Sequence, residues 1–146
     1  MTDAQLRYAM EWSREEHEDF ILRFPRLTGQ AYWSGTWSLF SIPCSRGWRP
    51  LLERCLDVAE PLADVRIGMV KQKWGELRIV FDYPGEQPDL ERVVDDVRAE
   101  SARTCEACGA PGEPALTASR WIRTLCTAHL PDGAAFVPLP SSEHPT

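Results

Sequence analysis

Four residues near the end of the chain have the types and the spacing of a metal-binding set. Cys105 and Cys108 form a CxxC pair, and Cys126 and His129 form a CxxH pair after the intervening residues 109–125. Two short-spaced ligand pairs, joined by a loop long enough to fold back, are typical of tetrahedral zinc sites. Catalytic zinc usually has three protein ligands and one open position, whereas this set supplies four ligands. The sequence therefore predicts a structural Zn²⁺ site; a catalytic zinc, or four residues that share no ion, are the alternatives.

The residues between the two pairs have the pattern needed to bring them together. Gly109 can adopt the left-handed backbone conformation that a turn after a CxxC pair usually requires. Turn-forming residues are frequent over 110–114, and the alternating run 121–125 predicts a strand that returns Cys126 to the metal. We expect a module of the zinc-knuckle or treble-clef type over residues 105–130.

Residues 1–104 predict an α+β core of three helices on a small antiparallel sheet. A capping box opens the first helix, which is expected over 2–24 and ends before Pro25. The second helix is expected over 48–60, and the third begins after 88 and leads directly into the first ligand pair.

Two runs with alternating apolar residues, 65–70 and 77–83, predict a β-hairpin. The stretch 26–47 is rich in aromatic and turn-forming residues and favours a short strand at 36–41, with burial in the core preferred over an aromatic binding surface. The last segment, 131–146, has four prolines and no periodicity, which predicts a disordered tail.

Two groups of basic and aromatic residues are candidates for contact with a partner. The first lies at the expected hairpin tip and its second strand, and the second lies inside the metal module. Their members are Lys71, Lys73, Trp74 and Arg78 in the first group and Arg120, Trp121 and Arg123 in the second. Such residues can hold a phosphate backbone and stack a base, and an exposed tryptophan also suits a protein partner. A solvated tip with a core tryptophan is the plainer alternative.

Composition limits the classes of function. With 43% hydrophobic and 26% charged residues, the chain is typical of a globular protein. The net charge of −6 disfavours general binding to nucleic acid or to anionic membranes but leaves room for a local basic patch. No apolar run approaches the ~20 residues of a membrane span. The first residues lack the pattern of a signal peptide, so we expect a cytoplasmic protein with reduced thiols.

The sequence contains no recognisable catalytic set. His129 belongs to the predicted metal site and His17 to an apolar helix face, so nucleophilic catalysis lacks a credible base. A glycine loop that could cradle phosphate is also missing. We therefore expect a non-enzymatic binding or regulatory protein with a protein partner. The first alternative is a nucleic-acid-binding protein that uses the 71–78 hairpin and the metal module, and the second is a nuclease-like enzyme with an unrecognised site.

Several of these motifs together resemble a family of small uncharacterised bacterial and phage proteins. That family has a Lys-x-Lys-aromatic-Gly-x-Leu-Arg hairpin ahead of a CxxC…CxxH or CxxC…CxxC module. The resemblance covers about residues 44–130 and rests on Gly47-Trp48, Leu51-Leu52, the run Val70 to Arg78, Ser101, the run Cys105 to Gly109 and the run Leu125 to His129. Trp74 stands where phenylalanine is commoner in the family, which keeps an aromatic residue at the tip. The resemblance implies no activity.

Overall fold

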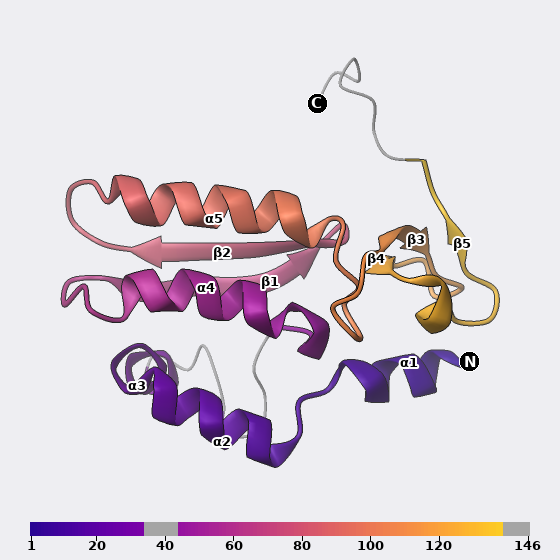
Figure 1. Cartoon of the computed structure of the whole chain (residues 1–146), viewed down its shortest axis with the longest axis horizontal. Coiled ribbons are helices and arrows are strands. Elements are labelled where there is room, and N and C mark those ends of the chain that lie inside the picture. Colours follow the sequence, from indigo (N-terminus) through magenta and orange to yellow (C-terminus); the bar gives the residue numbers. More distant parts are fainter. Residues whose placement is uncertain (34–43, 139–146) are drawn as a thin grey trace.

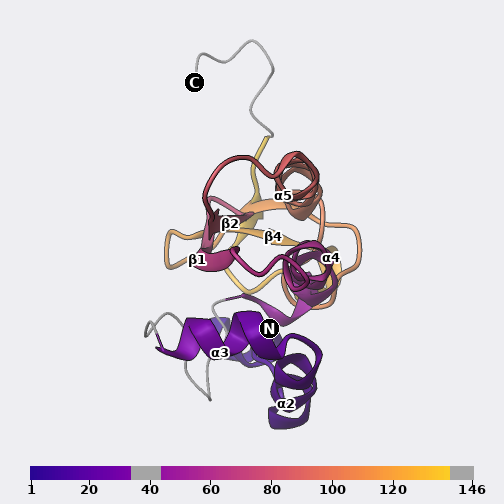
Figure 2. The same ribbon diagram turned by 90° about the vertical axis from the view of Figure 1, so that its left-hand side faces the viewer.

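A β-hairpin with two helices on one side forms the centre of the fold (Figure 1). Strands β1 (Arg66–Lys73) and β2 (Glu76–Asp82) are antiparallel, and helices α4 (Arg49–Ala59) and α5 (Pro88–Ser101) pack against each other. Figure 2 places both helices on the same side of the two strands. The structure, a computed structural model, describes residues 1–33 and 44–138, and its α+β class is the one predicted.

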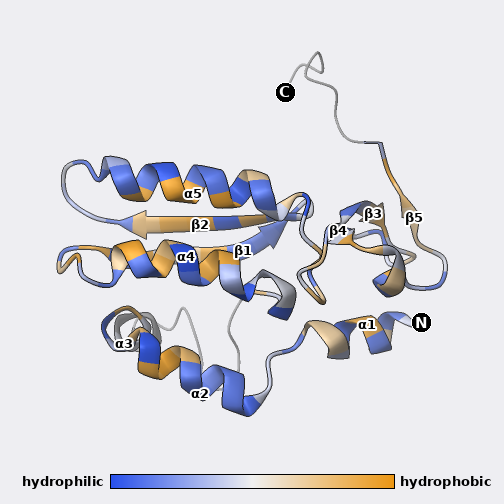
Figure 3. Ribbon diagram, in the orientation of Figure 1, coloured by the Kyte–Doolittle hydropathy of each residue, from blue (hydrophilic) through white to orange (hydrophobic). Residues whose placement is uncertain are grey.

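Alternating burial along the strands explains this packing. In β2, Leu77, Ile79 and Phe81 are buried, whereas Val80 and Asp82 are exposed. Because strand side chains alternate between faces, one face of the hairpin packs on the helices and the other faces solvent. Figure 3 shows that β2 is mostly hydrophobic and that the end of β1 is hydrophilic. The buried side chains of the hairpin form one apolar cluster with those of the neighbouring elements. Its other members include Trp48, Leu51, Leu52, Cys55, Leu56, Ala59, Val65, Ile67, Val70, Leu90 and Val97.

The N-terminal segment forms two helices where the sequence predicted one. Helix α1 (Asp3–Met10) opens with the expected capping box but ends after eight residues, about two turns. Ser13 and Glu16 form a second capping box that starts α2 (Arg14–Arg23). The prediction of a single helix over 2–24 is wrong because a local N-cap interrupts an apolar pattern that continues across the break.

A further helix, α3 (Pro25–Trp33), begins at the residue that was expected only to end the first one. Proline is favourable in the first helical turn because its missing N–H would have no partner there. Glu60 accepts hydrogen bonds from the backbone N–H groups of Arg26 and Leu27, at 2.7 and 3.0 Å, and so fixes the start of α3. The described residues thus contain five α-helices, not three, and none is long and apolar enough to cross a membrane. The strand expected at 36–41 lies outside the described residues.

The metal module contains a second sheet, beyond one end of the hairpin (Figure 1). Strand β3 (Glu113–Leu116) lies between β4 (Ile122–Leu125) and β5 (Ala135–Phe136), and both pairings are antiparallel. The presence of β5 corrects the expectation of disorder from residue 131 onward, because backbone pairing with β3 orders a segment that has no periodicity of its own. Residues 139–146 lie outside the described part of the chain.

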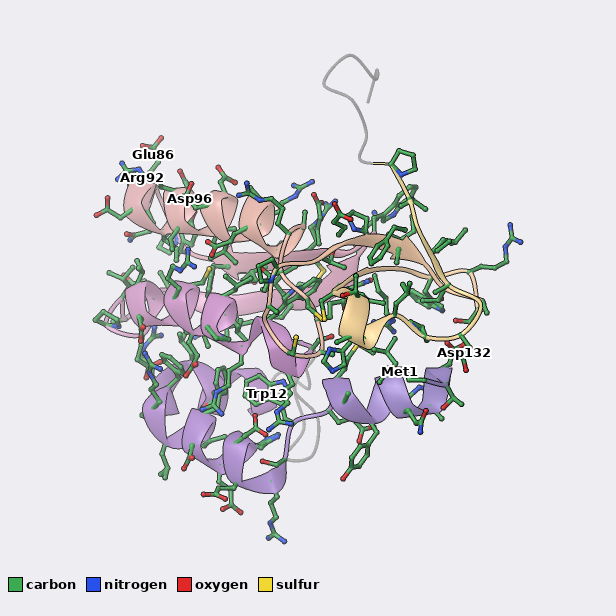
Figure 4. The ribbon with its side chains drawn as sticks, turned by 45° about the vertical axis from the view of Figure 1, so that its right-hand side comes forward. Met1, Trp12, Glu86, Arg92, Asp96 and Asp132 are labelled. Atoms are coloured by element: carbon green, nitrogen blue, oxygen red, sulfur yellow. The ribbon has the colours of Figure 1, made fainter. Side chains whose placement is uncertain are left out.

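The N-terminus packs against this second sheet. The ammonium group of Met1 lies 3.3 Å from the carboxylate of Asp132, and Figure 4 shows the two residues at the same corner of the molecule. Leu6 and Met10 of α1 are buried in a small cluster with Leu125 of β4. Helix α1 therefore supplies apolar surface to the metal module.

Candidate metal centre and contact surface

The structure brings the four predicted ligands together. One donor atom from each of Cys105, Cys108, Cys126 and His129 lies within 4.8 Å of the others. The Sγ atoms of Cys108 and Cys126 are 3.7 Å apart, and His129 Nδ1 lies 3.3 Å from the Sγ of Cys126 and 4.0 Å from that of Cys105. Cys105 is buried, Cys108 is exposed, and the other two are half-buried. This group could hold a metal ion.

Backbone turns position each ligand pair. Gly109 has a φ of 80°, the left-handed conformation expected for it, and its N–H donates to the carbonyl of Cys105 at 2.9 Å. The N–H of Cys105 donates to the carbonyl of Ala110 at 2.7 Å, so the turn closes around the first pair. The second pair spans a short 3₁₀ turn, η2 (Thr127–His129), that follows β4 directly.

The two less exposed thiols differ in acidity. Burial raises the pKa of Cys105 above its usual value. Burial also acts to raise the pKa of Cys126, but hydrogen bonds with His129 and with the neighbouring thiols outweigh it and lower that pKa. Because metal ligands must be deprotonated, binding of a metal to this cluster releases protons and strengthens as the pH rises.

A buried carboxylate between the first two ligands connects the metal loop to the rest of the molecule. Glu106 is 0% exposed and accepts hydrogen bonds from the backbone N–H of Thr124 (2.9 Å) and from Ser45 Oγ (3.1 Å). Its carboxylate also accepts from Arg123 Nη1 (3.2 Å) and from Gln72 Nε2 (3.3 Å). Burial raises the pKa of Glu106, and the Arg123 guanidinium opposes that rise. The sequence analysis missed this residue, because only its place between two ligands signalled that it would be buried.

The backbone of Glu106 adds two further links. Its N–H donates to the carbonyl of Thr124 at 2.9 Å, and its carbonyl accepts from the N–H of Gly47 at 2.8 Å. Gly47 belongs to the 3₁₀ turn η1 (Arg46–Trp48) that leads into α4. The metal loop is therefore bonded to β4 on one side and to the start of α4 on the other.

The hairpin tip is tighter than the sequence predicted. Strand pairing continues to Lys73 and Glu76, so only Trp74 and Gly75 form the turn, and both lysines lie on β1 instead of in the turn. Both turn residues have positive φ, 58° and 80°, as a two-residue turn of type I′ requires. This conformation is unfavourable for a bulky residue such as Trp74. Trp74 is nevertheless 69% exposed, so burial of this residue does not offset the strain.

The two predicted contact groups meet at this tip. A hollow of about 300 Å³ is lined by Gln72, Lys73, Trp74, Arg120, Trp121 and Ile122. We call it the tryptophan hollow. Gln72 Nε2 donates to the carbonyl of Ile122 at 2.6 Å, and Thr124 Oγ1 donates to the carbonyl of Gly75 at 2.7 Å, so hydrogen bonds join the tip to β4. Trp121 is 58% exposed. The hairpin tip and the metal module thus form one surface.

The basic residues of the two groups differ in their partners. Arg78 pairs with Glu76 at 2.9 Å, and Arg123 pairs with Glu106 and lies 6.0 Å from the centroid of the Trp121 ring. Within residues 1–33 and 44–138, the cations with no carboxylate at salt-bridge distance include Lys71, Lys73 and Arg120. Lys71 and Lys73 are both exposed, and Arg120 has a φ of 68°. These three cations are available to a partner.

The cysteines outside the cluster have the character of core residues. Burial raises the pKa of Cys55 to about 12 and raises that of Cys44 still further. A thiolate nucleophile needs a lowered pKa and partial exposure, so neither residue suits nucleophilic chemistry. His17 is 5% exposed, and burial lowers its pKa.

Comparison of the chain with protein-family models, with curated proteins and with solved structures gave no match.

Proposed function

We propose that this protein is a non-enzymatic binding protein, stabilised by one zinc ion, that holds a macromolecular partner at the tryptophan hollow. The observation that carries the proposal is the direct connection between the two sites. Glu106, which lies between two metal ligands, bonds to Gln72 and Arg123, and these two residues lie in and beside the hollow. The metal thus stabilises the loop on which the contact surface is built.

Zinc fits the donor set in chemistry and in geometry. Zinc bonds of about 2.3 Å to sulfur and about 2.0–2.1 Å to nitrogen place tetrahedral donors roughly 3.5–3.8 Å apart. The separations of 3.7 Å for Cys108–Cys126 and 3.3 Å for Cys126–His129 are close to that range, and the 4.0 Å for Cys105–His129 is somewhat longer. Three thiolates and one imidazole also form a soft set that magnesium and calcium disfavour. Free thiols at this site require a reducing compartment, which supports a cytoplasmic location.

Binding explains the hollow better than catalysis does. Two large exposed aromatic side chains cost free energy in water and contribute little to packing. Backbone strain of about 1–3 kcal/mol at a non-glycine residue with positive φ is typical of functional sites. Trp74 and Arg120 both have that conformation and both line the hollow. Four protein ligands leave the zinc no open position for a substrate.

Metal analysis tests the first part of the proposal. Protein purified without added zinc should contain close to one zinc per chain. A Cys108→Ser variant should lose most of it, whereas Cys55→Ala, which removes a thiol outside the cluster, should keep it. Full zinc retention by Cys108→Ser would overturn the assignment.

Affinity capture tests the second part. Tagged protein is incubated with bacterial extract, with and without nuclease treatment, beside Trp74→Ala and Trp121→Ala variants. Tyr8→Ala is the matched control, since Tyr8 is an aromatic residue that is 80% exposed on α1. A partner retained by Tyr8→Ala and lost by both tryptophan variants supports the hollow as the contact site. Equal capture by all variants would place the contact elsewhere.

A further inference from the structure

We propose that the tryptophan hollow binds single-stranded nucleic acid, with Trp74 and Trp121 stacking on bases and with Lys71, Lys73 and Arg120 contacting phosphates. This proposal rests on the proposed function and names the class of partner. The sequence alone favours a protein partner, whereas the arrangement of side chains in the hollow favours a nucleic acid.

The two tryptophans have the exposure that stacking requires. Trp74 is 69% exposed and Trp121 is 58% exposed, and both line the same hollow of about 300 Å³. That volume is at the lower end of the range for small-ligand pockets, and it is enough for a single flat base. Every base has a π-face, so two such rings provide sites for stacking that tolerate any sequence. Only unpaired bases can reach them without disruption of a duplex.

The described cations that have no carboxylate partner would contact the phosphates. Lys71, Lys73 and Arg120 have no carboxylate partner among the described residues, so an anion would not have to displace one. Lys71 lies directly opposite Arg78 across the hairpin, and Arg78 is already paired with Glu76 at 2.9 Å, so Lys71 is the member of this cross-strand pair that has no carboxylate partner in the described part of the chain. A phosphate beside Lys71 would supply the missing counter-charge.

Acidic side chains are fewer along the hairpin than along α5 and the residues just before it. Residues 66–82 contain four basic and two acidic side chains, whereas residues 86–100 contain two basic and six acidic ones. Figure 4 shows Glu86, just before α5, and Arg92 and Asp96 of α5 on the side of the molecule remote from the metal module. The net charge of −6 should oppose unspecific binding of duplexes to the molecule as a whole.

Fluorescence anisotropy with a labelled short oligothymidylate tests the proposal on the full-length, zinc-loaded protein. Binding should weaken as salt rises, with a slope of about −2 in log K against log salt if three phosphates are contacted, because each contributes roughly −0.7. A Lys71→Gln, Lys73→Gln double variant should reduce the slope to about −0.7. Trp74→Ala and Trp121→Ala should each weaken binding by about tenfold or more.

Two matched variants serve as controls. Tyr8→Ala removes an aromatic side chain that is more exposed than either tryptophan, and Arg92→Gln removes an exposed cation on α5. Both should bind the oligonucleotide as the unmodified protein does. Zinc content and helical circular dichroism are measured on every variant, so that a loss of binding is not confused with a loss of folding.

Three results with nucleic acid would overturn the proposal: the oligonucleotide does not bind, its affinity is unchanged by both tryptophan substitutions, or a duplex of equal length binds as tightly. A fourth would also overturn it: the oligonucleotide does not bind, but a polyglutamate peptide does and its binding depends on the tryptophans. The last result would assign the hollow to an acidic protein segment and leave the proposed function intact. Binding of neither probe would refute the nucleic-acid proposal alone, since affinity capture tests the proposed function independently.

Discussion

The hairpin core and the metal module differ in how many apolar side chains they bury. Within the described residues, eighteen buried side chains form the cluster around the hairpin, α4 and α5, including Trp48 and several leucines. The cluster of the metal module has six buried members, of which Leu6 and Met10 come from α1. Burial of apolar surface can hold the first region together. The second buries few apolar side chains, so a metal ion bound at the Cys/His cluster would add stability that this small core does not supply by itself.

Polar contacts join the two regions. The indole Nε1 of the buried Trp48 donates to the carbonyl of Thr104 at 2.8 Å, and Glu106 bonds to Gln72 of β1. A few directed hydrogen bonds thus join the hairpin core to the region that contains the Cys/His cluster. The tryptophan hollow lies at this junction and depends on both.

Removal of the metal should have the largest effect on stability, and it should unfold the metal module while the hairpin core stays folded. Structural zinc contributes about 10–16 kcal/mol in isolated zinc-finger peptides, which are unfolded without it. With excess chelator we expect proteolysis to begin within 105–138, while α4, α5 and the hairpin remain protected and most helical signal is kept. Limited proteolysis with mass spectrometry, beside circular dichroism, measures this. Loss of all helical signal in the same transition would show that the hairpin core cannot fold alone.

A substitution at the junction should have a smaller effect. In Glu106→Gln the side chain keeps its shape but loses the charge that Arg123 faces, and hydrogen bonds to charged groups are worth about 1.5–3 kcal/mol. We expect a lower melting temperature and unchanged zinc content, because Glu106 is not a ligand. Glu113→Gln, on an exposed position of β3, should melt as the unmodified protein does. An unchanged melting temperature for Glu106→Gln would mean that the buried carboxylate does not stabilise the junction.

The smallest effect on stability is expected within the hairpin core, between α4 and α5. Glu100 of α5 pairs with Arg54 of α4 at 2.7 Å, and the hydrogen bond from Arg54 lowers the pKa of Glu100. A lowered carboxyl pKa stabilises the fold above the unfolded-state pKa, and that stability is lost as the pH falls through the folded pKa. Both side chains are partly exposed (45% and 44%), so the pair contributes no more than about 1 kcal/mol.

Urea unfolding of the chelated protein, where metal loss adds no pH dependence, measures this contribution. Glu100→Gln should be less stable than the unmodified protein at neutral pH and equal to it once the carboxylate is protonated. Asp89→Asn, which alters a carboxylate that is 87% exposed, is the control. A stability difference between Glu100→Gln and the unmodified protein that persists at low pH would argue against the ion pair as its source.

The sequence by itself determined the features that depend on neighbouring residues. Ligand spacing identified Cys105, Cys108, Cys126 and His129, and period-two alternation identified the hairpin, because both signals act over a few residues. A local signal at Ser13 and Glu16 was also present, and the apolar periodicity across it led to the wrong helix.

Only the tertiary structure decided what lies together across long separations. It buried Glu106 beside Gln72, gave residues 135–136 a strand partner in β3, and joined Trp74 to Trp121 in one hollow. None of these contacts is encoded by local periodicity or spacing, because each depends on how the hairpin and the metal module pack. The sequence therefore predicted both contact groups, and the tertiary structure brings them together on one surface.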